Sequence, residues 1–273
     1  NTGKGIFIIN EGGYGAGNAS LSYFNTDSNS VSNNVFYNTN SIPLGDVAQS
    51  MVIIDSIGYI VVNNSGKIEV INVNTFESYA TITGFTSPRY MLPVNDEKAY
   101  ITDMYCDSIA IIDLNSNSIT GYINAGKNTE QMVMCNNYVF VTNWSYGNSI
   151  QVINPDSDQV VDSVEVVKQP NSIVADKNDN IWVLCDGGWV DEMPALIKLN
   201  SGTFNIENTF TFSDINSSPS KLCINANKDT IYFLNNGIYQ MLISDGNLPT
   251  SPIVNTGSKL FYGLGVNPEN SDI

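Results

Sequence analysis

The sequence contains no histidine, one arginine and few charged side chains of either sign. Without histidine, the chain lacks the commonest general base and metal ligand, and it cannot form a Ser-His or Cys-His nucleophile pair. Charged residues make up only 14% of the chain, whereas Asn, Ser, Thr, Gly and Tyr are abundant. That composition is typical of strands and turns and unfavourable for surface helices, so we expect an all-β fold.

Basic side chains are also scarce, because 11 Lys and Arg stand against 27 Asp and Glu and give a formal charge of −16. Nucleic acids and anionic lipid surfaces both recruit clustered basic side chains, so we expect neither as a partner. The sequence has no apolar run long enough to span a bilayer, and residues 1–5 lack the apolar region of a signal peptide. We expect a chain that has already been processed or trimmed.

Motifs for metal binding and for disulfide scaffolds are missing too. Cys106, Cys135, Cys185 and Cys223 are far apart, and three of them lie inside apolar runs, which favours buried free thiols over disulfides. The segment 113–117, DLNSN, begins like a calcium loop but lacks the glycine and the distal glutamate of such loops. We therefore predict no metal site.

One apolar segment recurs along the chain. Its copies begin between 40 and 53 residues apart, which is the period of a four-stranded propeller blade with loop insertions in the two longest intervals. A second apolar segment, a polar turn and a third strand follow each copy, so we predict an all-β propeller of four-stranded antiparallel blades. The copies span residues 6–10, 59–63, 99–103, 139–143, 181–185 and 231–235.

A shorter segment precedes each of the five later copies, and a sixth follows the last copy; each is expected to be the innermost strand of its blade. These segments span residues 49–53, 88–92, 130–134, 170–174, 219–223 and 261–265. One interpretation closes six blades by pairing residues 260–266 with the blade that begins at Ile6. The other takes residues 267–273 as the turn into a further blade. We favour the second, in which 1–273 is a single seven-bladed propeller domain with six countable blades and an incomplete last one.

Two classes of loop are expected on one face: the loop before each innermost strand, and the loop between the second and third strands of each blade. Alignment of the innermost strands places one hydrogen-bonding residue per blade around the mouth of the channel. Their differing chemistry fits an asymmetric ligand, and a polar, water-filled channel explains it equally well. The aligned residues are Ser50, Arg89, Gln131, Asn171, Ser220 and Tyr262.

Aromatic side chains are concentrated in the same loops. Flat side chains with a polar tip bind planar ligands or sugar rings, although each can instead pack against a neighbouring blade. Together with polar and acidic neighbours they form the predicted ligand-binding set: Asp46, Ser50, Arg89, Tyr90, Tyr105, Glu130, Gln131, Trp144, Tyr146, Asn171, Asp186, Trp189, Phe261 and Tyr262.

Some members of this set have other interpretations. Arg89 contacts a ligand or forms a structural ion pair with Asp46 or Glu130. An enzyme that cleaves glycans would use two carboxylates as acid and base, the candidates being Asp46, Glu130, Asp186, Asp191 and Glu192. Because acidic loop residues are most often soluble surface, we predict no catalytic residue and no enzyme.

The repeat resembles the YncE-like, surface-layer class of seven-bladed propellers over the whole chain. More specific segments resemble the BtuG group, which comprises surface lipoproteins of gut Bacteroides that bind cobalamin. These segments are EGGYG at 11–15, GNASLS at 17–22, LGDVAQSM at 44–51, FTSPRY at 85–90, TEQMV at 129–133 and WSY at 144–146. The sequence departs from that group in two respects, since the lipid-bearing cysteine is absent from these first residues and the last blade is incomplete.

The resemblance implies a non-catalytic outer-membrane lipoprotein at the cell surface. Such a protein captures a corrinoid (vitamin B12) and delivers it to a BtuB-like TonB-dependent transporter, contacting the membrane only through a lipid anchor. Cobalamin would be the bound ligand, with no catalytic cofactor, and no protein imidazole would hold its cobalt. Two alternatives stay open: a glycan-binding or glycan-cleaving surface propeller, and a scaffold for protein interactions.

Overall fold

The fold is given by a computed structural model that describes residues 4–257, 259–267 and 270–273. The chain divides into two compact units, Asn1–Gly126 (unit 1) and Lys127–Ile273 (unit 2). Among the described residues, no helix is long and apolar enough to cross a membrane.

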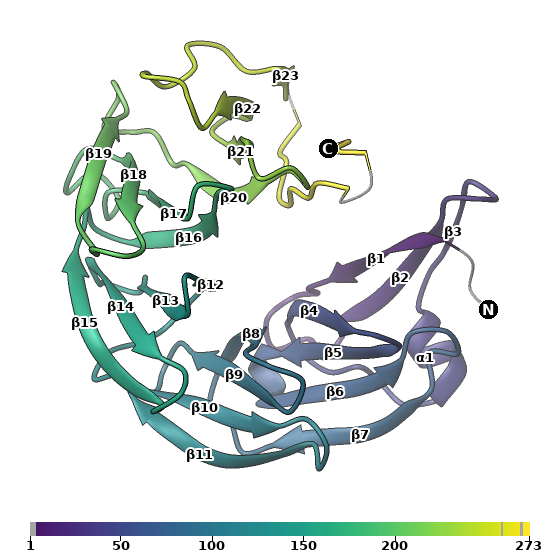
Figure 1. The fold of residues 1–273 in the computed structure, drawn as a ribbon. Helices are drawn as coiled ribbons and strands as arrows, with labels where there is room; N and C mark the ends of the chain where they lie inside the picture. The colour runs from purple at the N-terminus through teal and green to yellow at the C-terminus, as the bar shows by residue number, and fades with distance from the viewer. Residues whose placement is uncertain (1–3, 258, 268–269) are drawn as a thin grey trace. The chain divides into compact units, whose positions relative to one another are not determined.

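Unit 1 contains three antiparallel sheets, the first with three strands and the others with four (Figure 1). The first sheet is β1 (Gly5–Asn10), β2 (Ser20–Asn25) and β3 (Ser30–Ser32). The second is β4 (Ala48–Ile54), β5 (Ile57–Val62), β6 (Lys67–Asn72) and β7 (Ser78–Thr83). The third is β8 (Pro88–Pro93), β9 (Lys98–Asp103), β10 (Ser108–Asp113) and β11 (Ser118–Asn124). The helix α1 (Val35–Asn40) and the 3-10 turn η1 (Asn63–Ser65) lie between strands.

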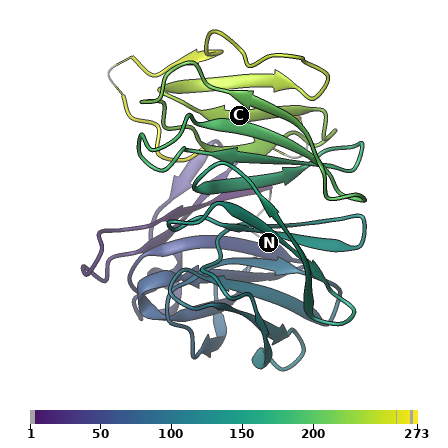
Figure 2. The ribbon, with the colours of Figure 1, turned by 90° about the vertical axis from the view of Figure 1, so that its left-hand side faces the viewer.

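Unit 2 contains three four-stranded antiparallel sheets. The first is β12 (Met132–Cys135), β13 (Tyr138–Asn143), β14 (Ser149–Asn154) and β15 (Gln159–Glu165). The second is β16 (Pro170–Ala175), β17 (Asn180–Cys185), β18 (Ala195–Asn200) and β19 (Ile206–Thr211). The third is β20 (Ser220–Ile224), β21 (Thr230–Leu234), β22 (Gly237–Leu242) and β23 (Val254–Asn255). Figure 2 shows the strands of this unit, teal to yellow, running across the view with their connecting loops at both ends.

The recurring apolar segments form the second strand of each complete blade, where both faces are buried. All six residues of β17 are buried, for example, and five of the six in each of β5, β9 and β13. Buried β-branched and aromatic side chains pack between successive sheets as two core clusters in each unit. The prediction of an all-β propeller built from antiparallel blades, six of them countable, is confirmed.

The predicted innermost strand at residues 261–265 is wrong, because the described residues 259–267 form no strand. Gly263 and Gly265 weaken a strand by their conformational freedom, and Leu260 is 87% exposed rather than packed in a sheet. The blade that contains β1 accordingly has three strands and no innermost one. The seventh blade and the single-domain organisation stay predictions.

The polar turns between the third and fourth strands are closed by an Asn or Asp at the end of the third strand. In the third sheet of unit 1, the Oδ1 atom of Asp113 accepts hydrogen bonds from the backbone nitrogen of Ser116 at 2.7 Å and from its hydroxyl at 2.9 Å. These bonds lower the pKa of Asp113. Asn72, Asn154 and Asn200 accept equivalent backbone bonds in their blades. The calcium-like DLNSN segment therefore contains a turn-closing carboxylate.

All four cysteines are free thiols, as predicted. Cys135 and Cys185 are buried, whereas Cys106 and Cys223 are half-buried. Burial raises the pKa of the Cys185 thiol and raises that of Cys223 to about 12. The thiolates of these two residues are therefore disfavoured at neutral pH.

Candidate functional site

The two predicted loop classes meet in unit 2. Gln169 lies in the loop before β16, and its backbone nitrogen donates a hydrogen bond of 2.7 Å to the carbonyl of Gly147, which lies in the loop between β13 and β14. The neighbouring residue of the same loop, Lys168, accepts a hydrogen bond of 3.1 Å at its carbonyl from the backbone nitrogen of Gly187, which lies in the loop between β17 and β18. Loops from two neighbouring blades are thus joined by backbone hydrogen bonds into one surface.

This surface surrounds a cavity of about 350 Å³, here called the aromatic pocket. It is lined by Tyr146, Lys168, Gln169, Gly188, Trp189 and Asp191. The rings of Tyr146 and Trp189 meet edge to face, with centroids 5.9 Å apart and planes inclined by 84°. Both side chains are nevertheless open to solvent, being 85% and 62% exposed. Lys168 Nζ and Asp191 Oδ2 form an ion pair of 3.2 Å at the same pocket.

The backbone around the aromatic pocket is strained. Tyr146, Gln169, Trp189 and Val190 have φ values of 56°, 54°, 57° and 71°, in the left-handed region that only glycine adopts freely. Such conformations cost of order 1–3 kcal/mol each and cluster at ligand sites. The exposed rings gain little from burial, so burial of the rings does not account for the strain.

Gln169 is the buried polar member of the pocket. Its residue is only 3% exposed, and its Oε1 atom is buried without a hydrogen-bond partner. No described residue makes a hydrogen bond with its side chain. An unsatisfied buried polar group costs about 1–3 kcal/mol, so the free protein is destabilised at this position.

Asp186 supports the pocket from behind. Its Oδ1 atom accepts from the Gly188 nitrogen at 3.0 Å, and its Oδ2 atom accepts from the Trp144 indole nitrogen at 3.4 Å. The side chain of Asn171 also hydrogen-bonds it. Burial nevertheless raises the pKa of the Asp186 carboxyl above the ordinary 3.8, since the hydrogen bonds only partly offset desolvation. Neither Trp144 nor Asn171 is among the residues that line the pocket.

In unit 1, the predicted residues mainly bridge loops and blades. Asp46 Oδ2 accepts from the Gly15 nitrogen at 2.9 Å and from Asn64 Nδ2 at 2.7 Å, and thereby ties three loops together. Ser50 donates to the Arg89 carbonyl at 2.7 Å. The predicted Tyr105 is 68% exposed on the loop between β9 and β10.

Arg89 and Tyr90 of unit 1 share one partner. Arg89 Nη1 donates to Gln49 Oε1 at 2.7 Å, and Gln49 Nε2 donates to the Tyr90 hydroxyl at 3.3 Å. The sequence alignment did not select Gln49 for the column around the channel. The polar side chains of this unit thus form a connected network between the innermost strands β4 and β8.

The predicted channel residues of unit 2 also connect innermost strands. Gln131 Oε1 accepts from the Ile173 nitrogen at 3.1 Å, and Asn171 Nδ2 donates to the Pro219 carbonyl at 2.8 Å. Glu130 is only 4% exposed. These contacts give the polar column a structural role between blades, and ligand contact by its members stays a prediction.

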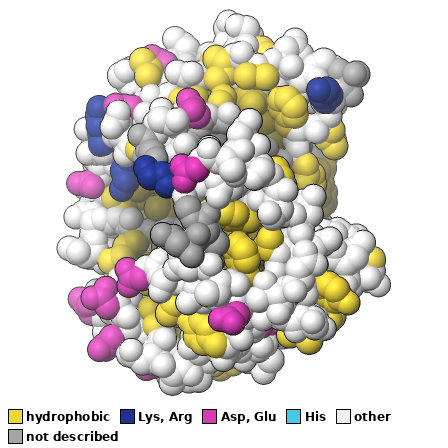
Figure 3. Space-filling model, turned by 90° about the vertical axis from the view of Figure 1, so that its right-hand side faces the viewer, with side chains coloured by type: hydrophobic (Ala, Val, Ile, Leu, Met, Phe, Trp, Pro, Cys, Tyr) yellow, Lys and Arg dark blue, Asp and Glu magenta, His cyan; other side chains and the backbone are white. Residues whose placement is uncertain are grey.

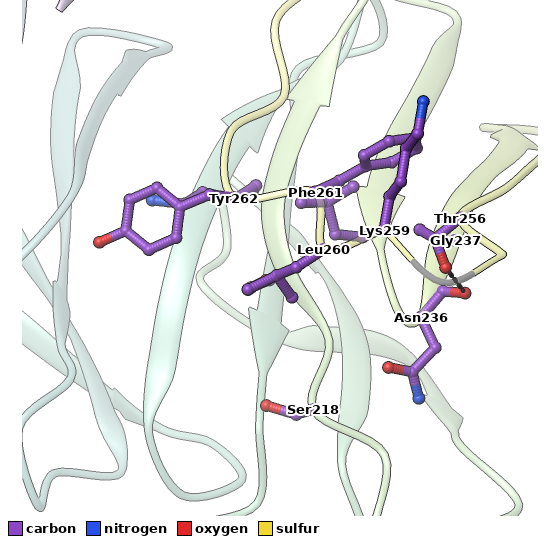
Figure 4. A pocket seen from close by; sticks show the side chains of 11 residues that line it. Ser218, Asn236, Gly237, Thr256, Lys259, Leu260, Phe261 and Tyr262 are labelled. Carbon is purple, nitrogen blue, oxygen red and sulfur yellow. Dashed lines mark hydrogen bonds between the residues drawn. The ribbon is translucent and has the colours of Figure 1, made fainter. Parts of the chain in front are cut away.

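Phe261 and Tyr262 line a second cavity of unit 2, of about 290 Å³, together with Ser220, Lys221, Lys259 and Leu260 among others (Figure 4). Lys221 Nζ lies 5.5 Å from the centroid of the Tyr262 ring, at cation–π distance. Figure 4 shows the Lys259 and Tyr262 side chains pointing in different directions. Uncharged side chains and backbone, drawn yellow and white, cover most of the face shown in Figure 3.

Gln49 and Lys221 do not stand out in the sequence pattern, because both lie at β-bulges. The registers of β4 and β20 with their partner strands shift between Ala48 and Ser50 and between Ser220 and Cys223. A bulge inserts an unpaired residue and redirects its side chain, which breaks the alternation used for the alignment. Gln169 was missed for another reason, since it directly precedes the predicted innermost strand 170–174, from which only Asn171 was selected.

Metal ligands do not gather in the part of the chain that the structure describes, where no three His, Cys, Asp or Glu side chains could hold an ion together. The carboxylates considered for catalysis have structural partners. Glu192 Oε2 accepts from the Lys168 nitrogen at 3.1 Å, and Asp191 pairs with the side chain of the same lysine. The site offers aromatic faces, an ion pair and a carboxamide, a combination suited to holding a ligand by contact and hydrogen bonding.

The fold and this loop surface define a β-propeller with a ligand-sized pocket between two blades. The chain belongs to the family described as a domain of unknown function (DUF5074), which matches residues 4–273. A comparison with curated proteins finds no match.

Solved structures with the same fold have low sequence identity. A quinonprotein alcohol dehydrogenase-like protein from Bacteroides thetaiotaomicron has a TM-score of 0.76 and 14% identity over 99% of this chain and 69% of its own. The extracellular domain of a putative one component system from the same organism has a TM-score of 0.65 and 14% identity over 87% of this chain and 34% of its own. Hydrazine synthase from Kuenenia stuttgartiensis has a TM-score of 0.61 and 12% identity over 71% of this chain, which spans 65% of that protein's chain. These likenesses establish the fold alone.

Proposed function

We propose that this propeller is an extracellular, non-catalytic protein that captures a corrinoid on its loop surface and delivers it to a TonB-dependent outer-membrane transporter, with a lipid anchor holding it at the cell surface. One observation carries the proposal: the exposed Tyr146 and Trp189 rings are kept in strained backbone conformations at a cavity. A corrinoid is broad, partly flat and fringed with amides, so it suits aromatic faces beside uncharged hydrogen-bonding groups.

Cell-surface location and the transporter rest on the resemblance of segments such as 44–51 and 85–90 to the BtuG group. A location outside the cytoplasm is further supported by similarity to a solved extracellular domain from Bacteroides thetaiotaomicron. Absence of catalysis is supported by the lack of histidine and by the structural partners of Asp46, Asp191 and Glu192.

Calorimetric titration of the full chain with cyanocobalamin tests the proposal. We expect saturable one-site binding, weakened about fivefold to thirtyfold by Trp189→Ala and by Tyr146→Ala, because each change removes an aromatic contact face worth about 1–2 kcal/mol. Tyr37→Ala is the matched control, since it deletes an exposed aromatic ring from the helix α1 of unit 1, outside the predicted ligand-binding set. Absence of heat with the unmodified protein at micromolar concentration would overturn the corrinoid proposal.

A glycan is the second candidate ligand, favoured by the Lys168–Asp191 ion pair beside the aromatic rings. Sugar rings stack on aromatic faces while charged and amide side chains hydrogen-bond their hydroxyls. Retention on a glycan array without release of reducing ends would support a glycan-binding propeller. Release of reducing ends would instead support an enzyme.

A further inference from the structure

The aromatic pocket contains a recognition group that the protein itself leaves unsatisfied. Gln169 is 3% exposed, lines the pocket and has no hydrogen bond from its side chain to any residue that the structure describes. The buried atom without a partner is Oε1. A buried polar atom without a hydrogen-bond partner is rare in folded proteins, because the folded state loses the hydrogen bonds that water would make. The residue is also held at a φ of 54°, so the backbone adds to the cost of this position.

The surroundings restrict what can satisfy this carboxamide. Lys168 and Asp191 neutralise each other across 3.2 Å, so the pocket offers no unpaired charge to a ligand ion. The Tyr146–Trp189 pair adds a flat apolar face on the same cavity. The complementary group is therefore uncharged and has an apolar face next to its polar atoms.

We propose that Gln169 is the specificity-determining residue of a subsite for an uncharged group that carries a hydrogen-bond donor and acceptor side by side. A carboxamide and a vicinal diol both have this chemistry. Because no other described residue fixes which end of the Gln169 carboxamide is oxygen, its donor and acceptor can both serve the ligand. This inference rests on the proposed function, in which the same pocket holds the ligand.

The test uses Gln169→Met in the full chain, a nearly isosteric change that removes only the polar atoms. Gln159→Met is the matched control, since Gln159 is an exposed residue of β15 outside the pocket. Cyanocobalamin supplies the carboxamides, and methyl β-D-glucoside and methyl β-D-galactoside supply the vicinal diols. Calorimetry and tryptophan fluorescence measure binding, and thermal unfolding measures the stability of the free protein.

We expect Gln169→Met to weaken binding of the ligand about tenfold, as loss of hydrogen bonds to a buried group does. The same variant should melt about 2 °C higher than the unmodified protein, because the unsatisfied amide is gone. Gln159→Met should change neither quantity. A purely structural Gln169 would give the opposite thermal shift, so a lower melting temperature overturns the proposal.

Comparison of cyanocobalamin with the methyl glycosides distinguishes failure of the Gln169 subsite from failure of corrinoid capture. Binding of a methyl glycoside but not of cyanocobalamin, with loss in Gln169→Met, supports the subsite and overturns corrinoid capture. Equal cyanocobalamin affinity of the variant and the unmodified chain supports corrinoid capture and overturns the subsite. Failure of every probe to bind the unmodified chain overturns both.

Discussion

At the scale of single residues, Val190 stands out because a β-branched side chain rarely adopts a positive φ. Its φ is 71°, and its side chain is 54% exposed, so little packing offsets the strain. Trp189 precedes it with a φ of 57°. These two residues hold the loop between β17 and β18 in the conformation that presents the indole ring at the aromatic pocket.

Val190→Gly should stabilise the free protein by about 1 kcal/mol, because relief of left-handed strain exceeds the entropic cost of glycine. Val161→Gly is the control, since Val161 is 50% exposed in strand β15, where the same change should destabilise by about 1 kcal/mol. Urea unfolding measures both. Destabilisation by Val190→Gly equal to that of the control would show that the left-handed backbone carries no cost.

At the scale of elements, Asp186 links the two loops that hold the aromatic rings. Its carboxylate accepts a hydrogen bond from the indole nitrogen of Trp144, in the loop between β13 and β14. It accepts another from the backbone nitrogen of Gly188, in its own loop. Its raised pKa has a defined consequence for stability. Above the ordinary 3.8 the unfolded chain has lost this proton while the folded protein retains part of it. The contribution of Asp186 to the free energy of unfolding is therefore present at low pH, and it is lost as the pH rises through the pKa of Asp186 in the folded protein.

The variant Asp186→Asn has no carboxyl group at this position, so its free energy of unfolding lacks this pH dependence. We expect the stability of the unmodified protein relative to this variant to fall between about pH 4 and neutrality, with no further change above the raised pKa. Urea unfolding of both proteins at pH 4.5, 5.5 and 7.0, each about half a unit or more above the ordinary aspartate value, checks the expectation. Parallel stability curves across this range would show that burial does not perturb Asp186.

Also at this scale, the sequence period located the blades but not their irregularities. The second strands were predictable because both of their faces are buried and their apolar runs are continuous. The helix α1 was not predicted, and it is fixed by burial of Val35 and Phe36 in the core of unit 1. Segment 261–265 has the pattern of a strand but forms none, because apolar residues alone do not supply a pairing edge.

At the scale of the whole molecule, the charge of −16 and the pI of about 4.1 act on every encounter with a charged partner. The proposed ligand group is uncharged, and Lys168, which lines the aromatic pocket, is already paired with Asp191. Long-range electrostatics should therefore contribute little to ligand affinity, although they repel polyanions.

The Kd for the ligand should stay within about twofold between 0.05 and 0.5 M NaCl, since salt screens only interactions between charges. Polylysine serves as the control, because its attraction to an acidic protein should disappear over the same range. Calorimetry at both salt concentrations measures this. A tenfold loss of ligand affinity at high salt would point instead to a charged ligand.

The sequence by itself determined the fold class, the positions of the blades and the two loop classes, because periodic burial and turn chemistry are local properties of the chain. It also excluded histidine chemistry outright. Only the tertiary structure decided which loop residues meet. Tyr146, Gln169 and Trp189 are far apart in sequence or unremarkable in type, and they share one pocket because hydrogen bonds join loops of neighbouring blades. The unsatisfied carboxamide of Gln169 is likewise visible only in three dimensions, since hydrogen-bond satisfaction depends on what surrounds a buried group.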